Sequence, residues 1–184
     1  TNCESLSVGG SLTSIQGATA NVSSHFQAVN CASLPFHPVF SVSTQAKTSK
    51  KNGASLDVKV GYPKGAYPGG QSQANIRSVA VTLPKQLPSR LTTIQQACPE
   101  GTFAANPASC PAGSVIGTGT AHTPVLANPV MGPAYLVSHG GAAFPDLVLI
   151  LQGEGITLEL VGSINIKKQV TSSAFNSVPD APIS

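Results

Sequence analysis

The stretch DLVLILQGEGITLEL at residues 146–160 decides the fold class. Its first part, 146–152, is apolar on both faces of an extended chain, which is typical of a central strand covered on both sides. A GEG turn follows, and then Ile156, Leu158 and Leu160 alternate with polar residues, which predicts a second strand with these three facing inward. We expect the most buried side chains to lie in the first strand: Leu147, Val148, Leu149, Ile150 and Leu151.

Working outward from this hairpin, strand patterns dominate the rest of the chain. Residues 39–44 and 55–60 flank an Asn52-Gly53 turn, a strong hairpin signal because both turn residues tolerate positive φ. Residues 75–83 alternate in the same way, and 164–166 extend the strand pattern after Gly162. Many short strands separated by turns predict an all-β fold, an antiparallel β-sandwich that is Ig-like or related, in one or two lobes.

Helix is scarce in this pattern, and we expect at most one short helix near residues 90–97. Ser89 would be its N-cap, and Leu91 and Ile94 would share one face. The alternative is a single helical turn. For domain organisation, we expect one β-rich module over 1–184, with a possible subdivision into N-terminal strands at 1–37 and a main sandwich at 38–184.

Composition excludes several classes of protein. The 184 residues include 41% hydrophobic and only 9% charged side chains, with a net charge of +3; an average soluble domain has ~25% charged residues. This much apolar content disfavours disorder. The longest apolar run, 147–151, falls far short of a membrane span of ~20 residues. The longest basic block, Lys50-Lys51, is too short to favour nucleic acid. We therefore expect neither nucleic-acid binding nor membrane insertion.

The cysteines indicate the compartment. Four stand at Cys3, Cys31, Cys98 and Cys110, and none forms a Cys-x-x-Cys pair. Three pairings are possible. We favour Cys98–Cys110, which closes a short irregular loop, and Cys3–Cys31 then follows by elimination. The alternative is four free thiols in a cytosolic protein. The hydroxyl- and amide-rich, charge-poor surface favours an oxidising, extracytoplasmic location, secreted or on the cell surface.

A set of short strings occurs in a fixed order along the chain. They stand at residues 29–36, 75–77, 81–85, 91–94, 97–98, 110–112, 116–117, 123–124, 132–137, 152–155 and 178–182. As an ordered set, over roughly residues 26–184, they resemble an uncharacterised module, often repeated, of large exported proteins of high-GC Gram-positive bacteria. The resemblance implies an extracytoplasmic, β-rich, disulfide-containing module of unknown activity. It also implies a further strand beyond 178–182, so we expect the C-terminal boundary to cut a natural unit.

Patterns that carry catalysis or metal binding are incomplete. Ser138–Gly141 reads Ser-His-Gly-Gly, as in an esterase oxyanion loop, but the Gly-x-Ser-x-Gly nucleophile elbow is missing from the sequence. Asp146 and Glu154 lie at opposite ends of one strand, roughly 25 Å apart, too far for a glycosidase pair. The histidines show no metal-ligand spacing: His25, His37, His122 and His139. We expect no catalytic, cofactor-binding or metal residue, and a hydrolase remains a remote alternative.

A Gly/Pro-rich loop at 61–70 is the candidate recognition element. Tyr62, Lys64 and Tyr67 are the candidate partner-binding residues, because tyrosine offers a large contact area at little entropic cost. The alternative is a hairpin tip whose tyrosines lie on their own prolines. We predict a non-catalytic structural or adhesive module of an exported multidomain protein, whose partners are neighbouring modules of the same polypeptide or cell-surface components. A module that binds a glycan or small ligand through this loop is the alternative function.

Overall fold

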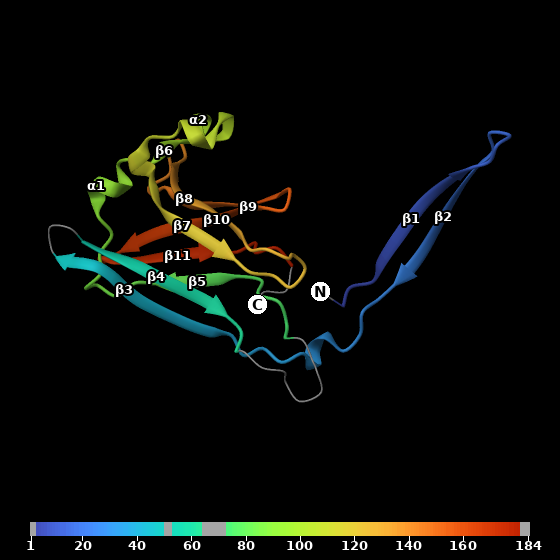
Figure 1. Cartoon of the computed structure of the whole chain (residues 1–184), viewed down its shortest axis with the longest axis horizontal. Helices are drawn as coiled ribbons and strands as arrows, with labels where there is room; N and C mark the ends of the chain where they lie inside the picture. The colour runs from blue at the N-terminus through green and yellow to red at the C-terminus, as the bar shows by residue number, and fades with distance from the viewer. Residues whose placement is uncertain (1–2, 50–52, 64–72, 181–184) are drawn as a thin grey trace. The chain divides into compact units, whose positions relative to one another are not determined.

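The structure is a computed structural model that describes residues 3–49, 53–63 and 73–180. The described chain divides into two compact units, and Figure 1 labels the elements of both. The first unit contains residues 3–37 with 73–75, and the second contains residues 38–63 with 76–180.

The first unit is built on one antiparallel hairpin. Strand β1 (Leu6–Thr13) pairs with β2 (Thr19–Phe26) over its whole length, with Leu6 opposite Phe26. The main-chain N–H of Ser14 donates to the Ala18 carbonyl at 2.8 Å, which closes the turn, and a short 3-10 turn at Cys31–Ser33 follows the hairpin. The Cys3–Cys31 disulfide links the segments on either side of the two strands.

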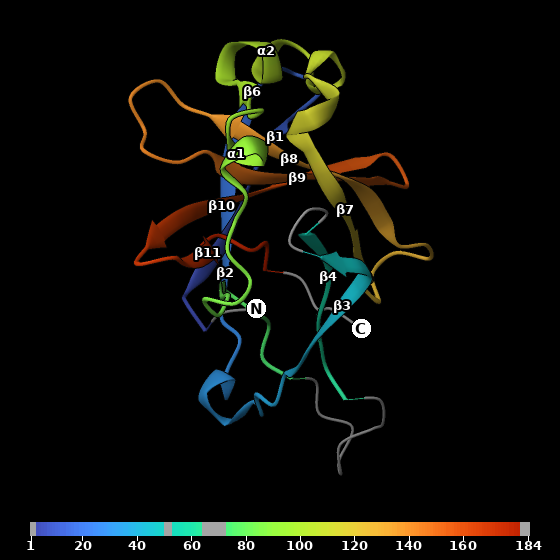
Figure 2. The same ribbon diagram turned by 90° about the vertical axis from the view of Figure 1, so that its left-hand side faces the viewer.

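The second unit is built on a seven-stranded sheet. The strand order is β5-β11-β10-β9-β8-β6, and β7 also pairs with β8. The bounds of these strands are β5 (Val79–Thr82), β6 (Cys98–Pro99), β7 (Val115–Ala121), β8 (Val130–Ser138), β9 (Asp146–Gly153), β10 (Ile156–Lys167) and β11 (Val170–Phe175). Apart from the two-residue β6, these strands curl into a half-barrel (Figure 2). All pairings are antiparallel except the short parallel bridge between β6 and β8.

A separate antiparallel ribbon precedes this sheet in the chain. Strand β3 (Val39–Ser49) pairs with β4 (Gly53–Gly61), with Phe40 opposite Val60 and Val42 opposite Val58. The strands at 39–44 and 55–60 are confirmed. Of the apolar β4 positions, Leu56 and Val60 are half-buried, and Val58 is exposed. Asn52 of the predicted turn lies outside the described residues.

Two short helices correct the prediction of at most one. Helix α1 (Leu91–Ile94) is a single turn within the predicted 90–97 segment. Ser89 does not cap it, because its hydroxyl is hydrogen-bonded to that of Thr171 at 2.8 Å. Helix α2 (Glu100–Ala105) starts directly after Pro99. The 3-10 turns Pro107–Ser109 and Ala112–Ser114 follow it. The chain is therefore mostly β, with antiparallel sheets, rather than wholly β.

The core of the second unit gathers around a disulfide. Cys98 is fully buried and packs with Phe103, Tyr135, Val137 and Val148. The Phe103 and Tyr135 rings meet edge to face at 5.4 Å, a favoured aromatic arrangement. Cys98 is bonded to Cys110, so both predicted disulfides are present. This core joins α2 and β6 to the middle strands β8 and β9.

Strand β9 is central, between β8 and β10, as the apolar run predicted. Its burial is less complete than expected: Val148 and Leu151 are 2% exposed, but the side chains of Leu147, Leu149 and Ile150 are half-buried. The β9–β10 turn has positive φ at Glu154 and Gly155, as a two-residue hairpin turn requires. Beyond it, Leu158 and Leu160 are half-buried. Ile156, at the hairpin end, is 39% exposed, so the expectation that it faces inward is wrong.

Candidate interaction surface

The structure describes one of the three predicted partner-binding residues. Tyr62 directly follows β4 and is half-buried, and this burial raises the pKa of its phenol. Lys64 and Tyr67 lie outside the described residues, as does most of the 61–70 loop. The loop therefore stays a prediction.

The β1–β2 hairpin has two chemically different faces. Residues directly opposite each other in an antiparallel pair project to the same side, and successive pairs alternate. One side, the apolar face, consists of four cross-strand pairs: Leu6/Phe26, Val8/Ser24, Gly10/Val22 and Leu12/Ala20. The other side, the polar face, consists of the remaining four: Ser7/His25, Gly9/Ser23, Ser11/Asn21 and Thr13/Thr19. The hairpin is thus amphipathic.

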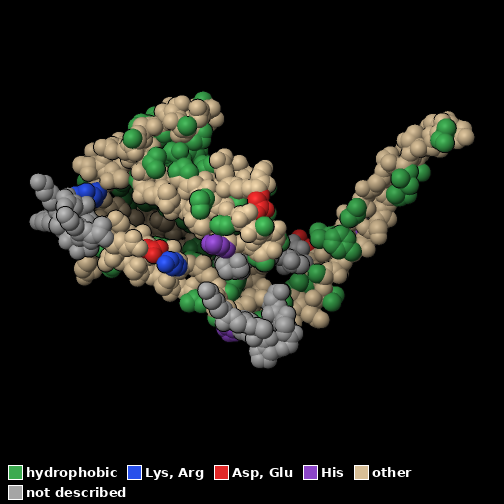
Figure 3. Space-filling model, viewed as in Figure 1, with side chains coloured by type: hydrophobic (Ala, Val, Ile, Leu, Met, Phe, Trp, Pro, Cys, Tyr) green, Lys and Arg blue, Asp and Glu red, His purple; other side chains and the backbone are tan. Residues whose placement is uncertain are grey.

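The apolar face is exposed along its whole length. Its large side chains range from 41% exposed at Leu6 to 62% at Val8 and Leu12, with Val22 and Phe26 in between. Figure 3 shows hydrophobic side chains along this hairpin. A two-stranded hairpin is marginally stable in water by itself, and an apolar patch with a polar surround marks an interaction site. This face is therefore the strongest candidate interaction surface on the described residues.

The apolar face of the hairpin carries no formal charge, and its surface is uneven. Between Leu6 and Phe26 the sequence contains no Lys, Arg, Asp or Glu. A shallow hollow lies where Gly9 and Gly10 have no side chain, and its walls include Val8 and Val22. Contacts made by this face would depend on shape and apolar packing rather than on ion pairs. The sequence signal was the alternation of Leu6, Val8 and Leu12, which Gly10 interrupts. This signal was missed in the sequence.

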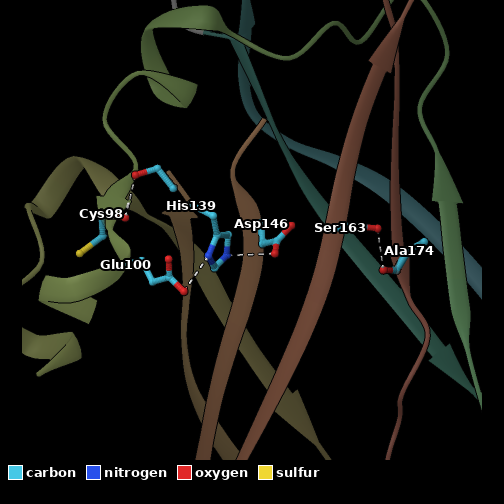
Figure 4. Close-up of polar contacts among 7 residues, drawn as sticks. Cys98, Glu100, His139, Asp146, Ser163 and Ala174 are labelled. Atoms are coloured by element: carbon cyan, nitrogen blue, oxygen red, sulfur yellow. Dashed lines mark hydrogen bonds and ion pairs between the residues drawn. The ribbon is translucent and has the colours of Figure 1, made fainter. Parts of the chain in front are cut away.

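A polar cluster lies in the second unit, around His139 in the loop after β8. The ring stands between two carboxylates (Figure 4): Nδ1 is 3.2 Å from Glu100 Oε1 of α2, and Nε2 is 3.1 Å from Asp146 Oδ2 at the start of β9. The Nε2 contact has ion-pair distance without hydrogen-bond alignment. The cluster therefore ties the β8–β9 loop to α2.

The cluster lacks the arrangement of a nucleophile with its base. The neighbouring Ser138 hydroxyl donates to the Cys98 carbonyl at 3.3 Å, whereas both His139 nitrogens face carboxylates. A catalytic serine needs its base within ~2.6–3.2 Å. Among the residues that the structure describes, no group of His, Cys, Asp and Glu has the geometry to hold a metal ion.

Asp146 and Glu154, which the sequence analysis rejected as a glycosidase pair, do not both lie in this cluster. Asp146 belongs to it, but Glu154 lies at the far end of β9, where its carboxylate accepts hydrogen bonds from the Asn128 main chain and side chain at 2.6 and 2.9 Å. These bonds lower the pKa of Glu154. His25 lies on the polar face of β2, and His122 follows β7. Glu100 was not among the predicted site residues.

Comparisons with known proteins add no assignment: no family model, curated protein or solved structure matches this chain. Across the described ranges, no helix has the length and apolarity needed to cross a membrane.

Proposed function

We propose that this chain is a non-catalytic structural or adhesive module of an exported or cell-surface multidomain protein. The observation that carries the proposal is the apolar face of the β1–β2 hairpin, which is exposed and uncharged over its four cross-strand pairs. An apolar sheet face of this kind is a site for another protein surface. Neighbouring modules of the same polypeptide or cell-surface components are the partners that fit it.

Two features support an extracytoplasmic location. The chain has two disulfides and no free cysteine among the described residues, and disulfides persist in oxidising compartments. We also propose that the fold is a β-sandwich: the half-buried Leu56 and Val60 of the β3–β4 ribbon suit a second layer over the large sheet.

Adhesion of displayed chains tests this function. Cells that display the full chain are mixed with plates coated with Gram-positive cell-wall material, with cells displaying the same chain, and with bare cells. We expect retention on one of the first two surfaces, weakened by Val8→Lys on the apolar face and retained with Ser7→Lys on the polar face. Tyr62→Ala tests the loop alternative in the same assay.

Two outcomes of these assays would contradict the proposed function. No retention on any surface would reject the adhesive role proposed for this face. Turnover of an ester or glycoside substrate panel that His139→Gln abolishes would favour the hydrolase alternative instead.

A further inference from the structure

The apolar face of the β1–β2 hairpin has a regular pattern of large and small side chains. In three successive rows, one strand supplies a large apolar side chain and the other a small residue. The large member changes strand from row to row, from Val8 on β1 to Val22 on β2 and back to Leu12 on β1. Their opposite residues are Ser24, Gly10 and Ala20. The face therefore has ridges and hollows in a definite order.

This order is self-complementary under one symmetry operation. A two-fold axis parallel to the strands, midway between two stacked hairpins, places β1 of one copy over β2 of the other and keeps each row over the same row. Val22 then meets Gly10 of the second copy, and Val8 meets its Ser24. Leu12 meets Ala20 in the same way. Facing layers pack best when large side chains meet small ones, and a two-fold interface pairs one patch with itself.

We propose that the hairpin's apolar face binds the same face of a second copy of this chain. This inference rests on the proposed function, since it names the partner of that surface. The hollow beside Gly10 receives Val22 of the second copy. The segment between Leu6 and Phe26 has no Lys, Arg, Asp or Glu, so two copies meet without like-charge repulsion, which costs several kcal/mol where it occurs.

The surface area buried between the two faces indicates how tightly the dimer is expected to bind. A fully exposed side chain of this size presents ~150–200 Å², so the observed exposures of the five large side chains leave about 450 Å² on each face. Two faces together bury about 900 Å², and the small residues between them add to this, which puts the pair at the low end of specific interfaces. The dimer is consequently concentration-dependent, and several copies in one polypeptide would strengthen it by raising the effective concentration.

Sedimentation equilibrium of the full oxidised chain over a concentration series tests the self-association. We expect a monomer–dimer equilibrium that Val22→Lys weakens at least tenfold, because the charge is buried without a partner. Ser23→Lys, one residue along the same strand but on the polar face, is the matched control and leaves the equilibrium within twofold of the parent.

Gly10→Val separates loss of the interface from loss of the hairpin. A Cβ at Gly10 has only an ordinary contact, 3.6 Å from Val22 Cγ2, and valine favours strands, so the hairpin is retained. The added side chain fills the place of the partner's Val22, so we expect the dimer to weaken at least tenfold while amide protection of the hairpin in the monomer is kept.

Cysteine cross-linking tests the row assignment. A mixture of Gly10→Cys and Val22→Cys chains should give a mixed dimer with a short bifunctional thiol reagent, since these positions face each other across the axis at the ~10 Å spacing of stacked sheets, which is beyond the reach of a direct disulfide. The matched control is a mixture of Gly9→Cys and Ser23→Cys, which lie on the polar face and should not cross-link. Equal cross-linking in both mixtures would overturn the assignment.

The remaining outcomes separate this inference from the proposed function. A chain that stays monomeric at the highest concentration, or a Val22→Lys chain that associates like the parent, overturns self-association. If such a monomer still adheres to cell-wall material, the proposed function stands and the occupant is another surface. If the monomer's hairpin is protected by the rest of its own chain, the occupant is internal and the inference is wrong.

Discussion

The β1–β2 hairpin and the large sheet are both antiparallel, and each is tied by one disulfide, yet they bury their side chains very differently. In the sheet, Cys98 is fully buried among aromatic and aliphatic side chains, and Val148 and Leu151 are 2% exposed. In the hairpin, every residue of both strands is exposed. Antiparallel strands are therefore stabilised by a packed core in the large sheet, whereas the hairpin has no such core.

Because only the sheet has a packed core, the two disulfides have different structural roles. Cys98–Cys110 belongs to a packed core and adds to apolar burial that already holds the sheet together. Cys3–Cys31 joins the segments beyond the two hairpin strands, where cross-strand hydrogen bonds have no covering layer. A bridge that constrains the open chain substitutes there for a missing core. The hairpin is then folded while its apolar face stays exposed.

The largest expected difference between the two regions is in the loss of unfolding free energy when a leucine is replaced by alanine. Leu151→Ala in β9 should cost ~2–5 kcal/mol of unfolding free energy, because it removes a buried side chain and leaves a cavity. Leu12→Ala in β1, 62% exposed, should change it by less than ~0.5 kcal/mol in dilute protein. Urea denaturation followed by circular dichroism measures both. Equal losses would mean that the hairpin leucine is packed in the monomer.

Removal of the hairpin's disulfide has the next largest effect. The Cys3→Ser/Cys31→Ser variant should lose ~3.5 kcal/mol by chain entropy for its 28-residue separation, enough to open a hairpin without a core. Hydrogen exchange should then be fast across residues 6–26 and unchanged in β8 and β9. Unchanged exchange in the hairpin would show that something other than the disulfide holds it.

The polar cluster of the large sheet predicts a smaller effect. His139→Gln removes the contacts with Glu100 and Asp146, but the His139 and Glu100 side chains are 35% and 62% exposed, so the loss should stay below ~1 kcal/mol. That is a fall in Tm of about 2–4 °C or less, reduced further in high salt. His122→Gln, in an exposed loop position, is the control and should leave Tm unchanged.

The smallest effect concerns the β9–β10 turn. Asn128 donates to the Glu154 carboxylate and lowers its pKa below 4.5. The folded state thus favours the ionised form, so this contact stabilises above about pH 4.5 and is lost as pH falls through the lowered value. An NMR titration of Glu154 should show an upward shift of its pKa in Asn128→Ala, which removes the side-chain donor. An identical titration in both proteins would contradict the assignment.

Where pattern and turn chemistry agreed, the sequence was sufficient. The apolar run at 146–152, the GEG turn and the alternation after it define β9 and β10 because a central strand must be apolar on both sides. The pairing of the four cysteines was predictable from the short loop between Cys98 and Cys110. The incomplete burial of Leu149 was not, because it depends on how the curled sheet is covered.

Other features depend on contacts between distant segments. Helix α2 has a glycine and a threonine in six residues and no capping side chain, so local propensity did not reveal it; packing of Phe103 on Tyr135 holds it in place. Glu100, His139 and Asp146 meet only because α2 lies beside the β8–β9 loop. The apolar face of β1 and β2 emerges only when their register is known, since Gly10 interrupts the alternation.

The central claim is that the hairpin's apolar face is covered by a second copy, and concentration-dependent hydrogen exchange tests it most directly. The full oxidised chain is labelled at high and low concentration, and exchange is compared in residues 6–26 and in β8 and β9. The account predicts slower exchange of the hairpin at high concentration and no change in the sheet strands. Hairpin exchange that is the same at both concentrations, in protein shown to span the expected association range, would contradict it.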